Sequence, residues 1–161
     1  MTGLEELENR LQRLEDERDI ARLIASYGPL VDAAEPDGTS DLWTDDGVYD
    51  VDGWKLNGRS RIGEMVRSGA HQTLVAGGCC HFLGPCVVTL SGDTAVAVCE
   101  SLILRKRDEE YVVFRASANH FELLRTAGGW RTVVRTTRLL DGGEVARRLL
   151  AAGVTGSPLP G

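Results

Sequence analysis

Apolar residues in the first part of the chain recur at alternating spacings of three and four, which is the pattern of an amphipathic helix. The repeat begins as a run of leucines and continues on a shifted face: Leu4, Leu7, Leu11, Leu14, Ile20, Leu23, Ile24 and Tyr27. The leucine run covers only two heptads, which is short for a coiled coil, so we expect the helix to lie along a core or a neighbouring subunit. Gly28 and Pro29 predict a kink or a break, because a proline inside a helix removes one backbone hydrogen bond.

Shorter elements are predicted between residues 39 and 69. A short helix over residues 39–47 would begin with Thr39 or Ser40 as its cap. The pair Asp52 and Gly53 lies between two alternating runs and predicts the two-residue turn of a β-hairpin. A second short helix is indicated over residues 59–69 by apolar side chains at helical spacing.

Long strand-like runs follow from residue 79, and turn-forming residues separate them. The runs cover about residues 80–91, 93–106, 110–125 and 129–140. Links this short join antiparallel neighbours, so the four runs predict a meander. A short helix over residues 143–153 and a loose tail would close the chain. Helices followed by a curved antiparallel sheet predict an α+β fold, in which the sheet wraps over the N-terminal helices and leaves a pocket between them.

The composition is that of a globular protein and narrows the set of partners. The chain has 161 residues, 42% hydrophobic and 26% charged, which suits one domain with a sizeable core. A net charge of -6 argues against nucleic acid and against an anionic membrane surface as partners. The acidic start lacks a signal-peptide pattern, and no apolar run approaches the roughly 18 residues of a membrane span. We therefore expect a cytoplasmic protein with reduced cysteines and no disulfides.

Three of the four cysteines lie together with a histidine in the stretch "CCHFLGPC", residues 79–86. Cys79 and Cys80 are adjacent and would point to opposite faces of a strand. No C-x-x-C pair occurs, so the spacing does not fit structural zinc. Two interpretations remain. Cys79, His81 and Cys86 could bind a metal ion, or the cysteines could be small buried apolar residues. We favour the second interpretation and predict no metal site.

His81 would lie on this strand among apolar neighbours, where a lone histidine is more often a satisfied core residue than a catalytic one. Asp32 follows the predicted kink, also in apolar surroundings, and either caps a turn or faces the pocket. If it faces the pocket, its carboxylate would hold the His81 ring in one tautomer and raise its basicity, as a general base requires. Tyr27 would then offer a phenol to an oxygen of a substrate.

The last two strands add further candidates. Arg135 shares a face with apolar residues, so a buried Arg135 would need a carboxylate partner such as Asp32 or Glu100. The alternative places Arg135 on the exposed face of the sheet. Asn119 and His120 are adjacent, so only one of them can reach a pocket. The expected pocket wall consists of Leu83, Val87, Leu102, Leu104, Asn119 and Val133.

Three stretches, residues 13–53, 81–101 and 119–135, together resemble the SnoaL-like branch of the nuclear transport factor 2-like superfamily. The resemblance covers roughly residues 4–142 and rests on the order and spacing of the stretches. It implies a cone-shaped α+β barrel with a deep apolar pocket, commonly assembled into dimers or trimers. We therefore expect one SnoaL-like domain over residues 1–142, followed by a short helix and tail over residues 143–161.

Within that family, the chain is most similar to lyase-type members such as scytalone dehydratase, bile acid 7α-dehydratase and hexachlorocyclohexane dehydrochlorinase. The resemblance implies a catalytic dyad of Asp32 and His81, with Tyr27 and Arg135 at matching positions. One acidic residue of the bile acid enzyme has no counterpart, because the nearest register places Leu104 there. This departure speaks against the same substrate.

Residues and resemblance together favour a cofactor-independent, dehydratase-type lyase that acts on a hydrophobic, polycyclic small molecule such as a steroid or a polyketide. His81 would remove a proton, Asp32 would orient His81, and Tyr27 would hydrogen-bond the carbonyl or the departing hydroxyl. Arg135 would balance the charge of Asp32. The alternatives are an isomerase or cyclase that uses the same base, a non-catalytic ligand-binding or assembly module, and a small subunit of a ring-hydroxylating oxygenase. The resemblance also implies a homodimer or homotrimer.

Overall fold

The first helix, α1 (Gly3–Asp32), is a single element of 30 residues in the computed structural model, which describes residues 2–159. A capping box starts it, because Thr2 Oγ1 accepts a hydrogen bond from the Glu5 amide and the Glu5 carboxylate accepts one from the Thr2 amide. The predicted break at Pro29 is wrong, since the helix continues through this proline to Asp32. Proline removes only one helical hydrogen bond, and close packing of the last turns against the sheet offsets that loss.

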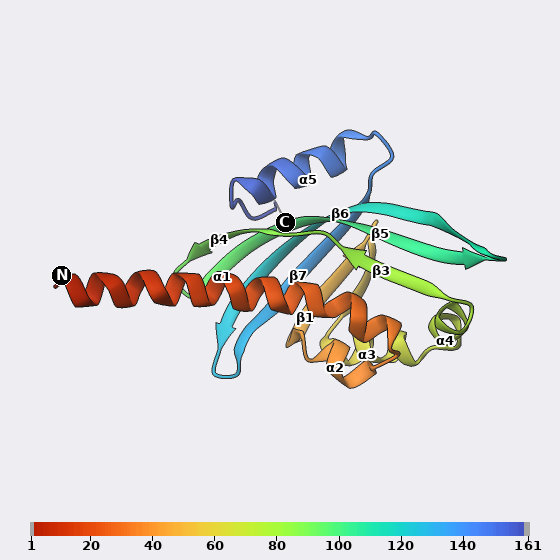
Figure 1. Ribbon diagram of the computed structural model, residues 1–161, viewed down its shortest axis with the longest axis horizontal. Coiled ribbons are helices and arrows are strands. Elements are labelled where there is room, and N and C mark those ends of the chain that lie inside the picture. The colour runs from red at the N-terminus through yellow and green to blue at the C-terminus, as the bar shows by residue number, and fades with distance from the viewer. Residues whose placement is uncertain (1, 160–161) are drawn as a thin grey trace.

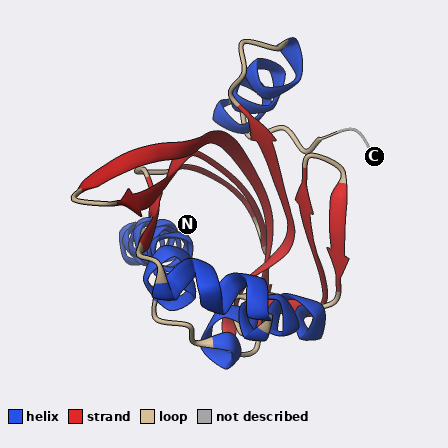
Figure 2. Cartoon of the chain, turned by 90° about the vertical axis from the view of Figure 1, so that its right-hand side faces the viewer, coloured by secondary structure: helices blue, strands red, loops and turns tan. Residues whose placement is uncertain are grey.

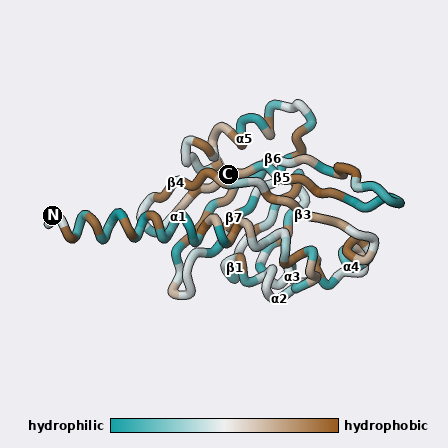
Figure 3. Tube along the Cα trace, viewed as in Figure 1, coloured by the Kyte–Doolittle hydropathy of each residue, from teal (hydrophilic) through white to brown (hydrophobic). Residues whose placement is uncertain are grey.

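The N-terminal half of α1 extends beyond the sheet (Figure 1). Its four leucines, Leu4, Leu7, Leu11 and Leu14, are 66%, 59%, 55% and 64% exposed. Hydrophobic and hydrophilic residues alternate along this part of the chain (Figure 3). Of the two expected positions, along a core or along a neighbouring subunit, the first therefore does not hold for these leucines.

The segment between α1 and the long strands contains short helices and a hairpin. These elements are α2 (Pro36–Ser40), β1 (Trp43–Val51), β2 (Trp54–Asn57), α3 (Arg59–Arg67) and α4 (Gly69–Ala76). The predicted helix over residues 39–47 is wrong, because a strand begins at Trp43 and buries that side chain in the core. The predicted hairpin turn is confirmed, since Asp52 and Gly53 both have positive φ, at 49° and 90°. Helix α4, which Ser68 caps, was not predicted.

A strongly curved sheet follows, and Figure 2 shows it wrapped around the N-terminal helices with the last helix on its convex side. The remaining elements are β3 (Cys79–Leu83), β4 (Val87–Ser91), β5 (Thr94–Arg107), β6 (Glu110–Thr126), β7 (Gly129–Leu139) and α5 (Glu144–Val154). The strand order is β2-β1-β7-β6-β5-β3, and β4 also pairs with β5. Neighbouring strands are antiparallel except β1 and β7, which are parallel. The α+β expectation is confirmed, with a sheet that curves without closing.

Two irregularities decide which side chains face the concave side of the sheet. The expected strand over residues 80–91 is divided by residues 84–86 into β3 and β4. In β7, the pairing with β6 shifts by one residue, so that Val133 lies in a β-bulge. Trp130 and Arg135 are consequently both buried on the concave side, although strict alternation would place them on opposite faces.

Apolar side chains cover both faces of the sheet. On the concave side, Ile20 and Ile24 of α1 pack in one cluster with Phe121 and Leu123 of β6. On the convex side, α5 packs against β5 and β6, and the backbone oxygen of Ser157 accepts a hydrogen bond from His120 Nε2 at 2.9 Å. The last two residues of the expected tail lie outside the described residues. Within residues 2–159, no helix combines the length and apolar character needed to cross a bilayer.

A partly buried ion pair fixes α1 to the sheet on the concave side. Arg125 Nη1 and Nη2 donate to the two carboxylate oxygens of Asp16, both at 2.6 Å. Trp130 Nε1 donates to the same carboxylate at 3.0 Å. These hydrogen bonds, with Arg125 the largest influence, lower the pKa of Asp16 to about 2. The contact joins residues 16 and 125 and so sets the position of the helix along the sheet.

We expect Asp16→Asn to lower the free energy of unfolding at pH 7 by about 2 kcal/mol, because an amide cannot accept both arginine hydrogen bonds. Since Asp16 has a lowered pKa in the folded state, its contribution is complete above about pH 4 and is lost as the pH falls towards 2. Urea unfolding at several pH values measures both effects. Asp93→Asn removes an exposed partner of Arg125 and serves as the control, with a change of no more than about 0.5 kcal/mol. Equal losses for the two variants would contradict this assignment.

Candidate active site

The last residue of α1 and the middle of β3 form a hydrogen-bonded dyad. His81 Nδ1 lies 2.6 Å from Asp32 Oδ1, and the His81 backbone amide donates to Asp32 Oδ2 at 2.7 Å. Because the carboxylate accepts from Nδ1, the proton of the neutral ring lies on that nitrogen and Nε2 keeps its lone pair. One carboxylate thus holds both the backbone and the ring of His81. The geometry is that of an oriented general base.

The close contact between α1 and β3 depends on a glycine. A Cβ atom added to Gly28 would lie 2.0 Å from the backbone oxygen of His81. Only a residue without a side chain lets the helix approach the strand this closely. Gly28 therefore sets the distance across which Asp32 reaches His81.

Burial controls the charge of the dyad histidine. It lowers the pKa of His81 below the ordinary 6.5, and the Asp32 carboxylate offsets part of that effect. His71 lies beside it, with ring centroids 6.2 Å apart, and also disfavours a positive charge on His81. His81 is therefore neutral at pH 7, which is the form that can accept a proton.

A small cavity of about 90 Å³ adjoins His81 on the concave side of the sheet. Tyr27 and Tyr49 line it together with Arg115 and Arg135. Ser101, Ser117 and Thr137 add hydroxyl groups to its wall. Val51, Leu83, Leu102 and Ile103 supply the apolar part of the wall, so polar and cationic side chains lie beside the base in a cavity that is otherwise apolar.

Tyr27 contacts both the dyad histidine and a cavity arginine. Its ring centroid lies 6.4 Å from that of His81 in an edge-to-face arrangement. The Arg135 guanidinium lies over the Tyr27 ring, with its carbon 4.1 Å from the ring centroid. Burial raises the pKa of Tyr27 well above 10, so its hydroxyl remains protonated and can donate to a substrate oxygen.

Arg135 is buried, and its partner differs from the expected carboxylate. Its Nε and Nη2 donate to Asn119 Oδ1 at 3.2 and 2.8 Å. Asp32 is engaged by His81, and Glu100 is exposed. The interpretation that Arg135 pairs directly with Asp32 or Glu100 is therefore wrong, because the site supplies a neutral amide and aromatic rings instead.

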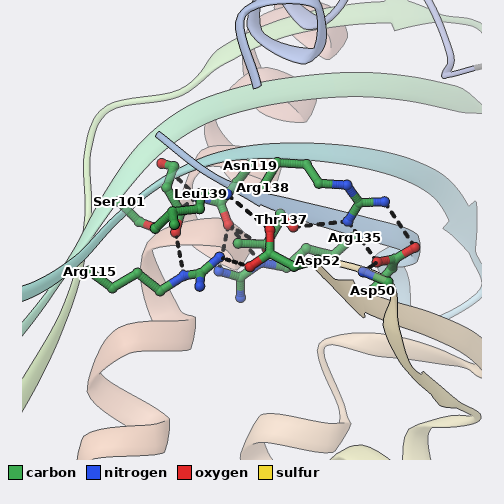
Figure 4. A network of polar contacts seen from close by, with 11 residues as sticks. Asp50, Asp52, Ser101, Arg115, Asn119, Arg135, Thr137, Arg138 and Leu139 are labelled. Atoms are coloured by element: carbon green, nitrogen blue, oxygen red, sulfur yellow. Dashed lines mark hydrogen bonds and ion pairs between the residues drawn. The ribbon is translucent and has the colours of Figure 1, made fainter. Parts of the chain in front are cut away.

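Asn119 is the centre of a polar network (Figure 4). Its Oδ1 also accepts from Thr137 Oγ1 at 2.9 Å, and its Nδ2 donates to Ser101 Oγ at 2.8 Å. These contacts place Asn119 on the concave face. His120 points to the convex face, where it contacts Ser157, so the open choice between the two is decided for Asn119. Asn119 supports the cavity from behind Arg135.

The sequence-predicted wall residues are only partly brought together. Leu83 and Leu102 line the cavity. Val87 does not, because the interruption before β4 leaves it 47% exposed. Val133 is displaced to the convex face by the β-bulge, and Leu104 lies beyond the cavity, opposite Cys80. Their predicted positions are corrected.

The sequence also left several cavity residues unrecognised. Tyr49 and Val51 lie two residues apart on β1, which is the spacing of one strand face, and this alternation could have marked them as inward-facing. Arg115 also lines the cavity, and it donates to Ser117 Oγ at 2.7 Å and to Asp52 Oδ2 at 2.5 Å. Asp52 belongs to the hairpin turn, so its contact with β6 could not be read from local pattern.

One group of side chains has the donor atoms of a metal site. Asp32, Cys79 and His81 each offer one atom, and these atoms lie within 4.8 Å of one another. Cys86 is not part of the group. Burial raises the pKa of the Cys79 thiol to about 11, and its Sγ donates to Asp32 Oδ1 at 3.4 Å. Asp32 Oδ1 thus accepts from both Cys79 and His81, which suits an oriented base.

Fold and site together define the class. A curved sheet around N-terminal helices, with a His–Asp dyad beside an internal cavity, is the architecture of a small-molecule-binding or catalytic domain. The model of the SnoaL-like domain family matches residues 12–136. The chain belongs to this family.

Solved structures support the same assignment. A nuclear transport factor 2-like protein with a cystatin-like fold from Novosphingobium aromaticivorans is 44% identical, with a TM-score of 0.90, and the match covers 93% of this chain and 98% of that one. A protein assigned as an aromatic ring hydroxylase from the same organism is 27% identical, with a TM-score of 0.66, and the match covers 79% of this chain and 90% of that one. The β subunit assigned to an aromatic-ring-hydroxylating dioxygenase of this organism is 19% identical and shares the fold. Its TM-score is 0.64, and the match covers 80% of this chain and 91% of that one. No curated protein matches the chain in sequence.

Proposed function

We propose that the protein is a cofactor-independent lyase of the dehydratase type. The observation that carries this proposal is the dyad: Asp32 holds Nδ1 of His81, which leaves Nε2 as a neutral base beside the cavity. His81 takes a proton from a carbon next to a carbonyl group, and Asp32 stabilises the resulting imidazolium. Tyr27 hydrogen-bonds the carbonyl. The proton then passes to the departing hydroxyl, so that water leaves and a carbon–carbon double bond remains.

The proposed substrate is a hydrophobic small molecule whose reacting end enters the cavity. A volume of about 90 Å³ is well below the roughly 300 Å³ of a pocket that encloses a whole ligand. The ring system of a steroid or polyketide would therefore extend out of the cavity. An isomerase or cyclase would use the same base without loss of water. A pure binding module would neither remove a proton nor release water.

Incubation in D₂O with β-hydroxy carbonyl compounds of increasing ring number tests the proposal. We expect loss of water from at least one of them, with new vinylic signals in NMR spectra. Deuterium uptake without loss of water would indicate an isomerase or cyclase. Binding without either change would overturn the assignment as an enzyme and support a binding module.

We also propose that the chain forms a homo-oligomer through the exposed leucines of α1. Leu4, Leu7, Leu11 and Leu14 have the spacing that packs against a similar helix. Arg10 and Glu15 flank this stripe at positions that face one another in a parallel pair, so a second copy offers both matching apolar and opposite charged groups. The occupant we propose is therefore a second copy of this chain.

The double variant Leu7→Glu, Leu11→Glu is expected to weaken self-association at least tenfold in sedimentation experiments, because it places four like charges in a dimer contact. Its stability should change by no more than about 0.5 kcal/mol, since both side chains are exposed in one chain. Val145→Glu, at an exposed site on α5, is the matched control. Association that is unchanged in the double variant would place the interface elsewhere.

A further inference from the structure

A nitrogen of Arg135 has no partner although it is buried. The side chain is 2% exposed, and two of its nitrogens donate to Asn119. The third, Nη1, has no hydrogen-bond partner among residues 2–159. Buried polar atoms are paired in nearly all folded proteins, so an unpaired guanidinium nitrogen at a cavity wall marks a position where a ligand atom fits.

The charge of Arg135 is also unmatched within the site. Arg115, the other cavity arginine, pairs with Asp52. Asp32 is held by His81, and the described residues place no carboxylate in an ion pair with Arg135. The groups around it are the Asn119 amide and the faces of Tyr27, Tyr49 and Phe121, which lie 4.1, 4.7 and 5.3 Å from the guanidinium carbon. A buried charge of this kind is stabilised strongly by an anion.

We propose that the substrate carries an anionic oxygen, from a carboxylate or an acidic enol, and that Arg135 Nη1 donates a hydrogen bond to it. This inference rests on the proposed function, because it names the substrate class of the same site. Arg135 then acts as a specificity-determining residue. Asn119 holds its other nitrogens, so the guanidinium is oriented before the anion arrives.

Arg135 and His81 both line the cavity, and Tyr27 lies near both of them. The guanidinium carbon of Arg135 is 4.1 Å from the Tyr27 ring centroid, and the His81 ring centroid is 6.4 Å from it. An anion bound by Arg135 would therefore occupy the same cavity as the carbon that loses its proton. A substrate with both groups on one short carbon skeleton fits a cavity of about 90 Å³.

Benzoate, 4-nitrophenolate and benzamide are suitable probes, because the first two present the two kinds of anionic oxygen and the third is a neutral molecule of similar shape. Calorimetry at about pH 8 is expected to show binding of at least one anion, with benzamide at least tenfold weaker. Arg135→Met should weaken the bound anion at least tenfold and leave benzamide unchanged. Arg138→Met is the matched control, since Arg138 lies on the same strand and pairs with Asp50 outside the cavity.

A second measurement keeps the inference testable where Arg135→Met fails to fold. In wild-type protein labelled with ¹⁵N arginine, the anion should shift the Arg135 side-chain signals more than those of Arg138, whereas benzamide should shift neither. Equal affinity for anion and amide in the wild type would overturn the inference, as would undiminished anion binding in a folded Arg135→Met variant.

The two proposals fail in different ways. Probe binding needs no turnover, so it is measured independently of the D₂O assay. Loss of the anion preference overturns the substrate class and leaves proton abstraction by His81 standing. Absence of turnover on every β-hydroxy carbonyl compound, with anion binding intact, overturns the lyase and leaves the anion site.

Discussion

Replacement of His81 by glutamine is expected to lower the rate of proton abstraction by about 10²–10⁴-fold, because glutamine has no basic nitrogen to replace Nε2. Loss of water in the D₂O assay, followed by the growth of the vinylic signals, measures this rate. The variant should remain folded, since a glutamine side chain can still hydrogen-bond Asp32 and fill much of the same volume. The loss would identify His81 as the base rather than as a satisfied core histidine.

His120→Gln is the matched control for this experiment. His120 is also a buried histidine, but it lies on the convex face and bonds the backbone of Ser157. Its replacement should leave the rate within about twofold. Similar losses in both variants would show that any disturbance of the sheet abolishes activity, and a fully active His81→Gln would remove the proposed base.

The pH dependence follows from the neutral state of His81. Burial lowers its pKa, so the base is unprotonated at pH 7 and the rate should be level there. As the pH falls below the lowered pKa, His81 becomes protonated and the rate should decrease tenfold per unit. The midpoint of this decrease is expected below 6.5, and a midpoint above that value would contradict the assigned environment.

Gly28→Ala is the second change with a large expected effect. The new methyl group would lie 2.0 Å from the backbone oxygen of His81, so α1 and β3 must separate. We expect a cost of about 3 kcal/mol for this overpacking, offset by about 1 kcal/mol of improved helix propensity, and thus a net loss of about 2 kcal/mol in the free energy of unfolding. The rate should also fall, because the shift lengthens the contact between Asp32 and His81.

Gly3→Ala supplies the control on the same helix. An added Cβ at Gly3 meets no atom within 4 Å, so the propensity gain is not opposed and stability should be equal or slightly higher. Urea unfolding measures both variants, and the D₂O assay measures the rate. If Gly28→Ala were as stable and active as the wild type, close approach of α1 to β3 would not be what positions the dyad.

The sequence predicted those elements that depend on the residues within the element itself. The Asp52-Gly53 turn formed as expected because these residues tolerate positive φ, and the runs over β5, β6 and β7 formed strands because apolar and polar residues alternate within them. Other elements were misjudged where packing overrides propensity. Pro29 stays within α1, and Trp43 begins a strand where a helix was expected.

The sequence by itself determined the α+β class, the long strands and the residue types of the candidate site, among them Asp32 and His81. Only the tertiary structure decided which side chains meet. Asp32 and His81 are 49 residues apart and come together because Gly28 lets α1 approach β3. Arg135 faces the cavity, where its partner is the Asn119 amide. It does so because the bulge at Val133 adds one unpaired residue to β7, so that residues before and after the bulge alternate out of phase. Periodicity specifies that a strand has two faces, but the register of pairing, which depends on contacts distant in sequence, assigns each residue to one of them.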